Sequence, residues 1–273
     1  MNKFMQLLRD NAKASGIQPV KVEVQDKEAT LYLYDVVVAT EDEWWGGVGA
    51  DAFVKALHGL ADKEVIHIRI NSPGGSVFAA RAIEQAIREH PAKIIAHVDG
   101  YAASAASFIA VACDEVEMSA GGFFMIHKAW MCSCGNSDDF IQATAFLEKV
   151  DTSLIDTYAA ESGQKAEDIA AWMQAETWFS AQEAVELGFA DRIAEGSSTK
   201  GAAAKWNLAA YANAPKHTAQ AEPPAKPAQD TVPAEQPVMP AANVEPDQQP
   251  DIAASAQRDH YLRRLDVAER TGR

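Results

Sequence analysis

Ser104 lies in the stretch DGYAASAASF (residues 99–108), which places two serines among small residues directly after a turn. A serine at the start of a helix lies close to the free N–H groups of the first helical turn, where the helix dipole favours negative charge. The alanines around it leave room for a peptide backbone. The pattern fits a nucleophile that attacks a carbonyl group, and it also fits a serine that caps or packs a helix. We interpret the second serine, Ser107, as a packing residue.

His127 ends the apolar stretch FFMIH (residues 123–127). A histidine at such a place often has a structural role, but imidazole also titrates close to neutral pH and can accept the proton of a serine. A strand-end position would bring it to the same sheet edge as Ser104. A catalytic triad further needs a carboxylate that orients the imidazole and stabilises its cation. The downstream candidates are Asp138, Asp139, Asp151, Asp156 and Glu176.

Two glycines follow Pro73 in the stretch INSPGG (residues 70–75). Because glycine has no Cβ, the N–H groups of such a turn can face a ligand at close range. By itself, Pro-Gly-Gly indicates only a turn.

The three cysteines, Cys113, Cys132 and Cys134, are an odd number and give no disulfide framework. Cys132 and Cys134 follow His127 closely. However, a Cys-x-Cys pair falls short of the four ligands of a closed zinc site. The sequence therefore predicts no metal and no cofactor.

The elements that must position these residues alternate along the chain. Runs rich in β-branched and aromatic residues predict strands, and runs with helical spacing predict helices. The predicted strands lie within residues 20–24, 29–39, 64–72, 93–98 and 114–127, and the predicted helices within residues 51–60, 76–90 and 101–113. This alternation predicts an α/β domain with a largely parallel sheet. Ligands of such sheets bind where strands end and helices begin, and both Ser104 and Gly75 lie at junctions of this kind.

The overall composition narrows the functional classes. The chain has 273 residues, 48% of them hydrophobic, and a net charge of −15 that disfavours binding to nucleic-acid phosphates. The absence of an apolar run of about 18 residues argues against a membrane span. Arg9, Asp10 and Lys13 stand where a signal peptide would have its apolar centre, so we expect a cytoplasmic protein.

A change of composition near residue 195 marks the end of the predicted folded domain. Nine of the twelve prolines lie between Pro215 and Pro250, among Ala, Gln and Glu. Such a segment buries too little apolar surface to offset the loss of chain entropy, so residues 196–251 are predicted to be a disordered linker. Helical spacing returns in residues 252–273, which are interpreted as a docking peptide or a frayed tail.

Four motifs in order resemble the Clp protease proteolytic subunit (ClpP) family, and more narrowly its phage and prophage head maturation branch. The motifs are INSPGGSV, DGYAASAASFIA, MIHKAW and ETWFSAQEAVELGFADRI, and the resemblance covers residues 28–195. It implies a ClpP/crotonase-like α/β fold, preceded by an N-terminal segment (residues 1–27). It also implies that residues 138–163 form a long helical handle through which family members interlock two rings.

The resemblance also implies roles for individual residues. Ser104 corresponds to the nucleophile, His127 to the base, and the backbone N–H groups of Gly75 and Ala105 to the oxyanion hole. Glu176 stands where family members carry an aspartate, so its extra methylene changes the reach of the carboxylate.

The implied function is a serine endopeptidase that cleaves scaffold or capsid proteins during phage head maturation. The implied assembly is a homo-oligomeric ring. The N-terminus does not resemble the segment with which housekeeping members engage an ATPase, so no unfoldase partner is expected. Residues 196–273 would tether the enzyme to capsid protein or serve as scaffold. Two alternatives remain: a crotonase-like acyl-CoA enzyme, which needs no Ser–His pair, and an inactive assembly protein on the same fold.

Overall fold

A computed structural model describes residues 3–11, 20–39, 46–196 and 206–215. All of them belong to one unit, Met1–Ala219, and a second unit comprises Gln220–Arg273. The predicted helical segment 252–273 and most of the predicted linker therefore lie outside the described residues.

The described chain alternates strands and helices, as the sequence predicts. The helices are α1 (Lys3–Asn11), α2 (Ala50–His58), α3 (Val77–Arg88), α4 (Ala105–Val111), α5 (Ser137–Ser162), α6 (Ala166–Ala175) and α7 (Ala181–Glu186). The strands are β1 (Val22–Gln25), β2 (Glu28–Leu33), β3 (Val37–Val38), β4 (Val48–Gly49), β5 (Val65–Ser72), β6 (Lys93–Ala103), β7 (Glu115–Met118), β8 (Phe123–Ile126), β9 (Thr177–Ser180) and β10 (Arg192–Ile193). Over the described residues, no helix is both long enough and apolar enough to cross a membrane.

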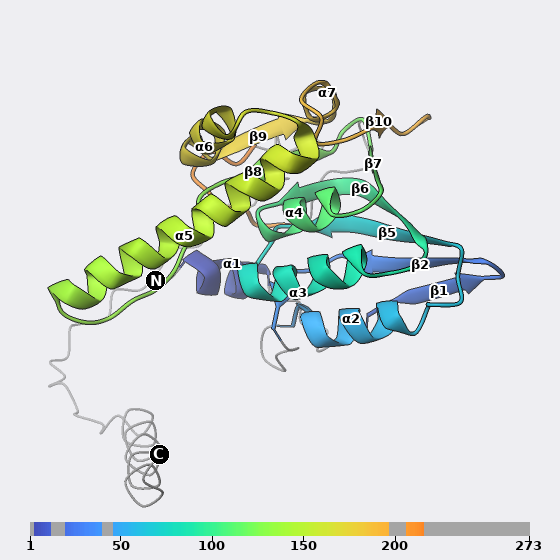
Figure 1. The fold of residues 1–273 in the computed structure, drawn as a ribbon, viewed down its shortest axis with the longest axis horizontal. Coiled ribbons are helices and arrows are strands. Elements are labelled where there is room, and N and C mark those ends of the chain that lie inside the picture. Colours follow the sequence, from blue (N-terminus) through green and yellow to red (C-terminus); the bar gives the residue numbers. More distant parts are fainter. Residues whose placement is uncertain (1–2, 12–19, 40–45, 197–205, 216–273) are drawn as a thin grey trace, which may run out of the picture. The chain divides into compact units, whose positions relative to one another are not determined.

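The main sheet confirms the prediction of a mostly parallel α/β fold. Its strands follow the order β1-β2-β5-β6-β7-β10, and β8 pairs with both β6 and β9. Only the β1–β2 and β8–β9 pairs are antiparallel within this sheet. Helices α2, α3 and α4 lie along one face of the sheet (Figure 1).

Strand β6 changes its partner halfway along its length. It pairs with β7 up to Val98 and then with β8 from Tyr101 to Ala103, and its register with β5 shifts in between. The sequence predicted a helix over residues 101–113, and this boundary was wrong, because α4 begins only at Ala105. The alanines that resemble a helix start instead extend the strand, since their pairing with β8 supplies the backbone hydrogen bonds.

The end of β6 separates two apolar clusters. Ala102 faces the main core below the helices, whereas Tyr101 and Ala103 face a second cluster, because side chains alternate along a strand. The second cluster also contains Leu7 from α1 and four residues near the end of the described chain: Trp206, Leu208, Ala210 and Tyr211. Residues 206–215, called the 206–215 segment below, were expected to belong to the disordered linker. The structure instead buries their apolar side chains against the domain.

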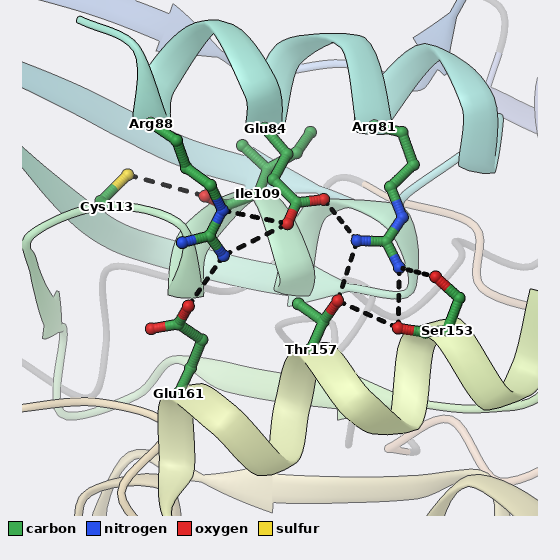
Figure 2. A network of polar contacts seen from close by, with 8 residues as sticks. All are labelled: Arg81, Glu84, Arg88, Ile109, Cys113, Ser153, Thr157 and Glu161. Atoms are coloured by element: carbon green, nitrogen blue, oxygen red, sulfur yellow. Dashed lines mark hydrogen bonds and ion pairs between the residues drawn. The ribbon is translucent and has the colours of Figure 1, made fainter.

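A buried carboxylate connects α3 to the long helix α5 (Figure 2). Glu84 is 6% exposed and accepts hydrogen bonds from Arg81 (2.6 Å) and Arg88 (3.2 Å). Each arginine then reaches α5: Arg81 donates to Thr157 and Ser153, and Arg88 donates to Glu161 at 2.8 Å. This network fixes the C-terminal half of α5, while the N-terminal end of α5 projects beyond the sheet (Figure 1).

Glu84→Gln is expected to lower the free energy of unfolding by about 1–3 kcal/mol, because it removes the negative charge between two guanidinium groups and turns an NH2 donor toward one of them. Urea denaturation followed by circular dichroism measures the change. Glu89→Gln, at an exposed position on the next turn, is the matched control and should change stability by less than about 0.5 kcal/mol. Equal effects of the two substitutions would contradict a structural role for the Glu84 network.

Candidate active site

Ser104 has a backbone conformation that is unusual for a residue with a side chain. It joins β6 to α4 with φ 53° and ψ −121°. Such a conformation costs roughly 1–3 kcal/mol and persists only where the surroundings impose it. Here the Ser104 N–H donates to the carbonyl of Met125 on β8 at 2.9 Å, so the turn is held by the neighbouring strand.

The buried hydroxyl groups of Ser107 and Tyr158 form a hydrogen-bonded chain that reaches the same turn. Ser107 Oγ donates to the Ser104 carbonyl at 2.6 Å and lies 2.7 Å from the hydroxyl of Tyr158 on α5. Ser107 is fully buried, which confirms the interpretation of this serine as a packing residue. The turn that carries Ser104 is therefore attached to α5 as well as to β8.

His127 lies beside Ser104, as the strand-end argument predicts. Its Nε2 is 2.7 Å from Ser104 Oγ. The two residues follow β6 and β8 directly, and these strands are parallel neighbours paired through Ala103 and Met125. Because parallel strands end at the same edge, residues that are distant in the sequence meet there.

Aromatic rings enclose the imidazole. Trp130 and Tyr211 pack against His127 with ring-centroid distances of 4.7 and 5.4 Å, and both meet it edge to face. Burial lowers the pKa of His127 to about 3, and the positive charge of Lys3 on α1 acts in the same direction. At neutral pH the imidazole is thus uncharged and has a lone pair available for a proton.

Gly75 and Ala105 both line a cavity beside Ser104 and His127. Ala105 is the first residue of α4, so its N–H has no acceptor within the helix. Gly75 forms an isolated parallel bridge with Val37, and the two hydrogen bonds of this bridge use the Gly74 carbonyl and the Ser76 N–H rather than the Gly75 N–H. A Cβ on Gly74 would lie 2.7 Å from Ser104 Cβ and 3.0 Å from Ala105 N, so only glycine allows the two turns to approach so closely.

The five carboxylate candidates have different surroundings. Asp138 and Asp139 lie in the first turn of α5, where Asp139 completes a capping box with Asn136, and Asp156 is exposed. Asp151 is buried and accepts a hydrogen bond from the Ala129 N–H at 2.8 Å, which holds the chain just after His127. Among the described residues, no carboxylate forms a hydrogen bond or an ion pair with His127.

Glu176 directly precedes the end of β9 that pairs with the end of β8. The last pair of the antiparallel β8–β9 register is Ile126 and Thr177, so His127 follows β8 and Glu176 precedes β9 at the same end of this pair. Glu176 is the C-cap of α6 and has a left-handed backbone conformation (φ 51°, ψ 72°), so it does not itself belong to the strand pairing. The Glu176 carboxylate nevertheless points elsewhere, because its Oε1 accepts the backbone N–H of Asn213 at 2.7 Å. The structure places Glu176 at the predicted edge but does not bring it to the imidazole.

A cavity of about 370 Å³ opens beside Ser104 and His127. Its walls are mainly apolar and come from α3, α4, α5 and the chain after His127, with Phe78, Phe108, Phe146, Met131 and Leu154 among them. Cys132 also lines it, whereas Cys134 does not. The site therefore combines a hydroxyl–imidazole pair with a pocket that accepts an apolar group.

Comparison with known proteins assigns this arrangement to a family. The family model described as Clp protease matches residues 47–197, which is more than half of the chain. The chain belongs to the Clp protease family. The ATP-dependent Clp protease proteolytic subunit 3 of Rhodococcus jostii (strain RHA1) is 31% identical over 133 residues, which cover 48% of this chain and 66% of that protein. The ATP-dependent Clp protease proteolytic subunit of Streptococcus pneumoniae (strain Hungary19A-6) is 33% identical over 137 residues, which cover 49% and 70%.

This Clp protease family chain has site residues that the sequence argument missed. The sequence pattern singled out neither Tyr158 nor Tyr211 as a site residue, and it included Trp130 only as the last residue of the motif MIHKAW. Trp130 lies three residues after His127 and could have been suspected from that spacing. Tyr211 gave no usable signal, because it stands in a segment rich in Ala and Asn beyond the last motif.

Because His127 is buried in its neutral form, we expect the folded chain to lose stability in weak acid. The pKa of His127 is lower in the folded chain than in the unfolded chain, where it is about 6.5, so the unfolded state binds more protons below that pH. Between about pH 7.5 and about pH 5.5, His127 alone should lower the free energy of unfolding by about 1.4 kcal/mol.

Urea denaturation of His127→Gln at the two pH values should show a decrease smaller by that amount than the wild-type decrease. Ser104→Ala removes the hydroxyl partner but retains the imidazole, so it should keep the wild-type decrease. A wild-type pH dependence in His127→Gln would show that this histidine is not buried in its neutral form.

Proposed function

We propose that this chain is a serine endopeptidase that acts through an acyl-enzyme. The observation that carries the proposal is the 2.7 Å contact between Ser104 Oγ and His127 Nε2 at a constrained turn. A neutral imidazole at that distance can accept the hydroxyl proton as the oxygen attacks a carbonyl carbon. Membership of the Clp protease family supports the same reaction class.

The proposed mechanism assigns one role to each group. Ser104 Oγ attacks the scissile carbonyl while His127 takes its proton, and the imidazolium then protonates the leaving amine. The N–H groups of Gly75 and Ala105 would bind the oxyanion, each with an effect on the order of 10²–10³ in rate. Water, activated by His127, then attacks the acyl-enzyme and releases Ser104.

The acid of the proposed triad is Glu176. Its position next to the last β8–β9 pair, Ile126 and Thr177, supports this role, and we expect a rotation of the side chain away from Asn213 to direct the carboxylate toward the imidazole. Asp151 is engaged with the Ala129 N–H, so we assign it to positioning of the chain after His127.

The apolar cavity suits a hydrophobic side chain next to the cleaved bond. The proposed substrates are scaffold or capsid proteins in a maturing phage head, and the motif resemblance alone supports this finer assignment. Mass spectrometry of the products formed from such proteins identifies the cleaved bonds, and cleavage after charged residues would contradict the pocket assignment.

We also propose that the chain assembles into a ring of identical subunits. The N-terminal half of α5 supports this idea, because Phe140, Ile141 and Phe146 are 50%, 67% and 44% exposed. Apolar side chains gathered on one helix segment mark interaction surfaces in soluble proteins.

Labelling with a fluorophosphonate probe tests the proposed catalytic pair. Ser104→Ala should abolish labelling, and His127→Ala should slow it by about 10²–10⁴-fold, because the general base is lost. Intact-mass spectrometry measures the modified fraction over time. If the assembled wild-type protein is not labelled at all, the result favours the inactive assembly protein. If Ser104→Ala still hydrolyses acyl-CoA, the result favours the crotonase-like enzyme.

Ile141→Asp should shift the chain from an assembly to smaller species, because it places a charge in the apolar surface of α5. Light scattering coupled to size-exclusion chromatography measures the mass. Gln142→Asp adds the same charge at a neighbouring exposed position and should leave the mass unchanged. Equal masses for the wild type and Ile141→Asp would contradict assembly through this surface.

A further inference from the structure

The 206–215 segment is anchored to the domain at several separate points. Trp206 Nε1 donates to Asn71 Oδ1 at 3.2 Å, next to the Pro-Gly-Gly turn. Asn207 and Asn11 of α1 exchange two hydrogen bonds, at 2.6 and 2.9 Å. The apolar side chains of Trp206, Leu208, Ala210 and Tyr211 are between 5% and 8% exposed. A segment with this many specific contacts occupies a defined place.

That place is the proposed catalytic site. The Tyr211 hydroxyl donates to the carbonyl of Pro73, directly before the two glycines, and the Tyr211 ring packs edge to face on His127. Tyr211 also lines the same cavity as Ser104 and His127, and its burial raises the pKa of its hydroxyl. Tyr211 therefore lies among the groups between which a substrate carbonyl would have to bind.

The same segment also holds the acid. The Asn213 N–H donates to Glu176 Oε1 at 2.7 Å, and Asn213 Nδ2 donates to the Ala175 carbonyl at 2.7 Å. Glu176 and His127 flank the last β8–β9 pair, Thr177 and Ile126, yet the Glu176 carboxylate is directed to Asn213. While this bond persists, the imidazole lacks the carboxylate that would stabilise its cation.

A buried N–H group next to the 206–215 segment has no hydrogen-bond acceptor within the part of the chain that the structure describes. Among the described residues, Trp178 Nε1 is buried without a hydrogen-bond acceptor. The Trp178 ring contacts Tyr211, with centroids 5.7 Å apart. An unsatisfied buried donor costs free energy, and removal of the segment would open this donor to water.

We propose that the 206–215 segment is an autoinhibitory element that covers Ser104 and His127 with Tyr211 and withholds Glu176 from His127 through Asn213. This inference rests on the proposed function. Release of the segment lets Glu176 turn to the imidazole and opens the space above Ser104 to a peptide substrate. The enzyme would then become active only where the segment is displaced, and premature cleavage would be avoided.

The experiment compares fluorophosphonate labelling rates of full-length variants. Asn213→Pro removes the N–H that holds Glu176, whereas the matched Asn213→Ala keeps this N–H and loses only the bond to Ala175. Tyr211→Phe keeps the ring but removes the donor to Pro73, and it serves as the second variant if Asn213→Pro does not fold. Asn213→Pro should label about 10–100-fold faster than wild type, with smaller gains for Tyr211→Phe and Asn213→Ala.

If the proposal is correct, the gain in labelling rate also depends on Glu176. Adding Glu176→Gln to Asn213→Pro should return labelling to the wild-type rate or below, whereas Asp151→Asn in the same background should retain a gain. If the wild type labels through Ser104 and the variants of the segment label no faster, the autoinhibitory role is wrong and the proposed peptidase stands. If Ser104 is labelled in none of the chains, both proposals fail.

Discussion

The active-site geometry depends on the change of partner along β6. Up to Val98 this strand belongs to the regular parallel sheet, and beyond the irregularity it continues beside β8. The ends of β6 and β8 are thereby brought to one edge, where Ser104 and His127 lie 2.7 Å apart. The β6–β7 register ends at Val98 and Met118, five residues before Ala103, so only the pairing with β8 brings the end of β6 beside His127. The change of partner therefore creates the geometry of the candidate site.

Small residues make this edge possible, and each of them is small for a different reason. Gly74 must lack a Cβ because the turn of Ser104 and Ala105 packs directly against it. Ala102 and Ala103 are buried on opposite faces of the last part of β6, where longer side chains would push β8 away. Ser107 is small enough to lie under the turn and still connects the Ser104 carbonyl to Tyr158. The alanine-rich motif thus reflects close packing around a strained residue as much as access for a substrate.

The parts of the structure that follow from local patterns could be predicted from the sequence. The strand at 65–72, the helix at 77–88, the placement of Ser104 at a strand–helix junction and that of His127 at a strand end all followed from spacing and turn residues. The start of α4 could not, because "YAAS" is compatible with helix and strand, and only its pairing with β8 decides between them. The prediction that residues 206–215 belong to a disordered linker was wrong as well. Their Trp, Leu and Tyr side chains are too few and too scattered among Ala and Asn to form a recognisable pattern, yet they pack in one apolar cluster with Tyr101 and Met125.

The position of Glu176 shows why an acid can be present at a site without taking part in it. The β8–β9 register ends at Ile126 and Thr177, which brings Glu176 to the same end of the sheet as His127. A glutamate has three side-chain torsions, however, so its carboxylate can turn toward different donors. The backbone N–H of Asn213 is such a donor, and it comes from outside the motifs that define the family. An aspartate at this position, one methylene shorter, would have had less freedom to reach a second donor. The proposed control element depends on this longer side chain, because the carboxylate has to alternate between Asn213 and His127.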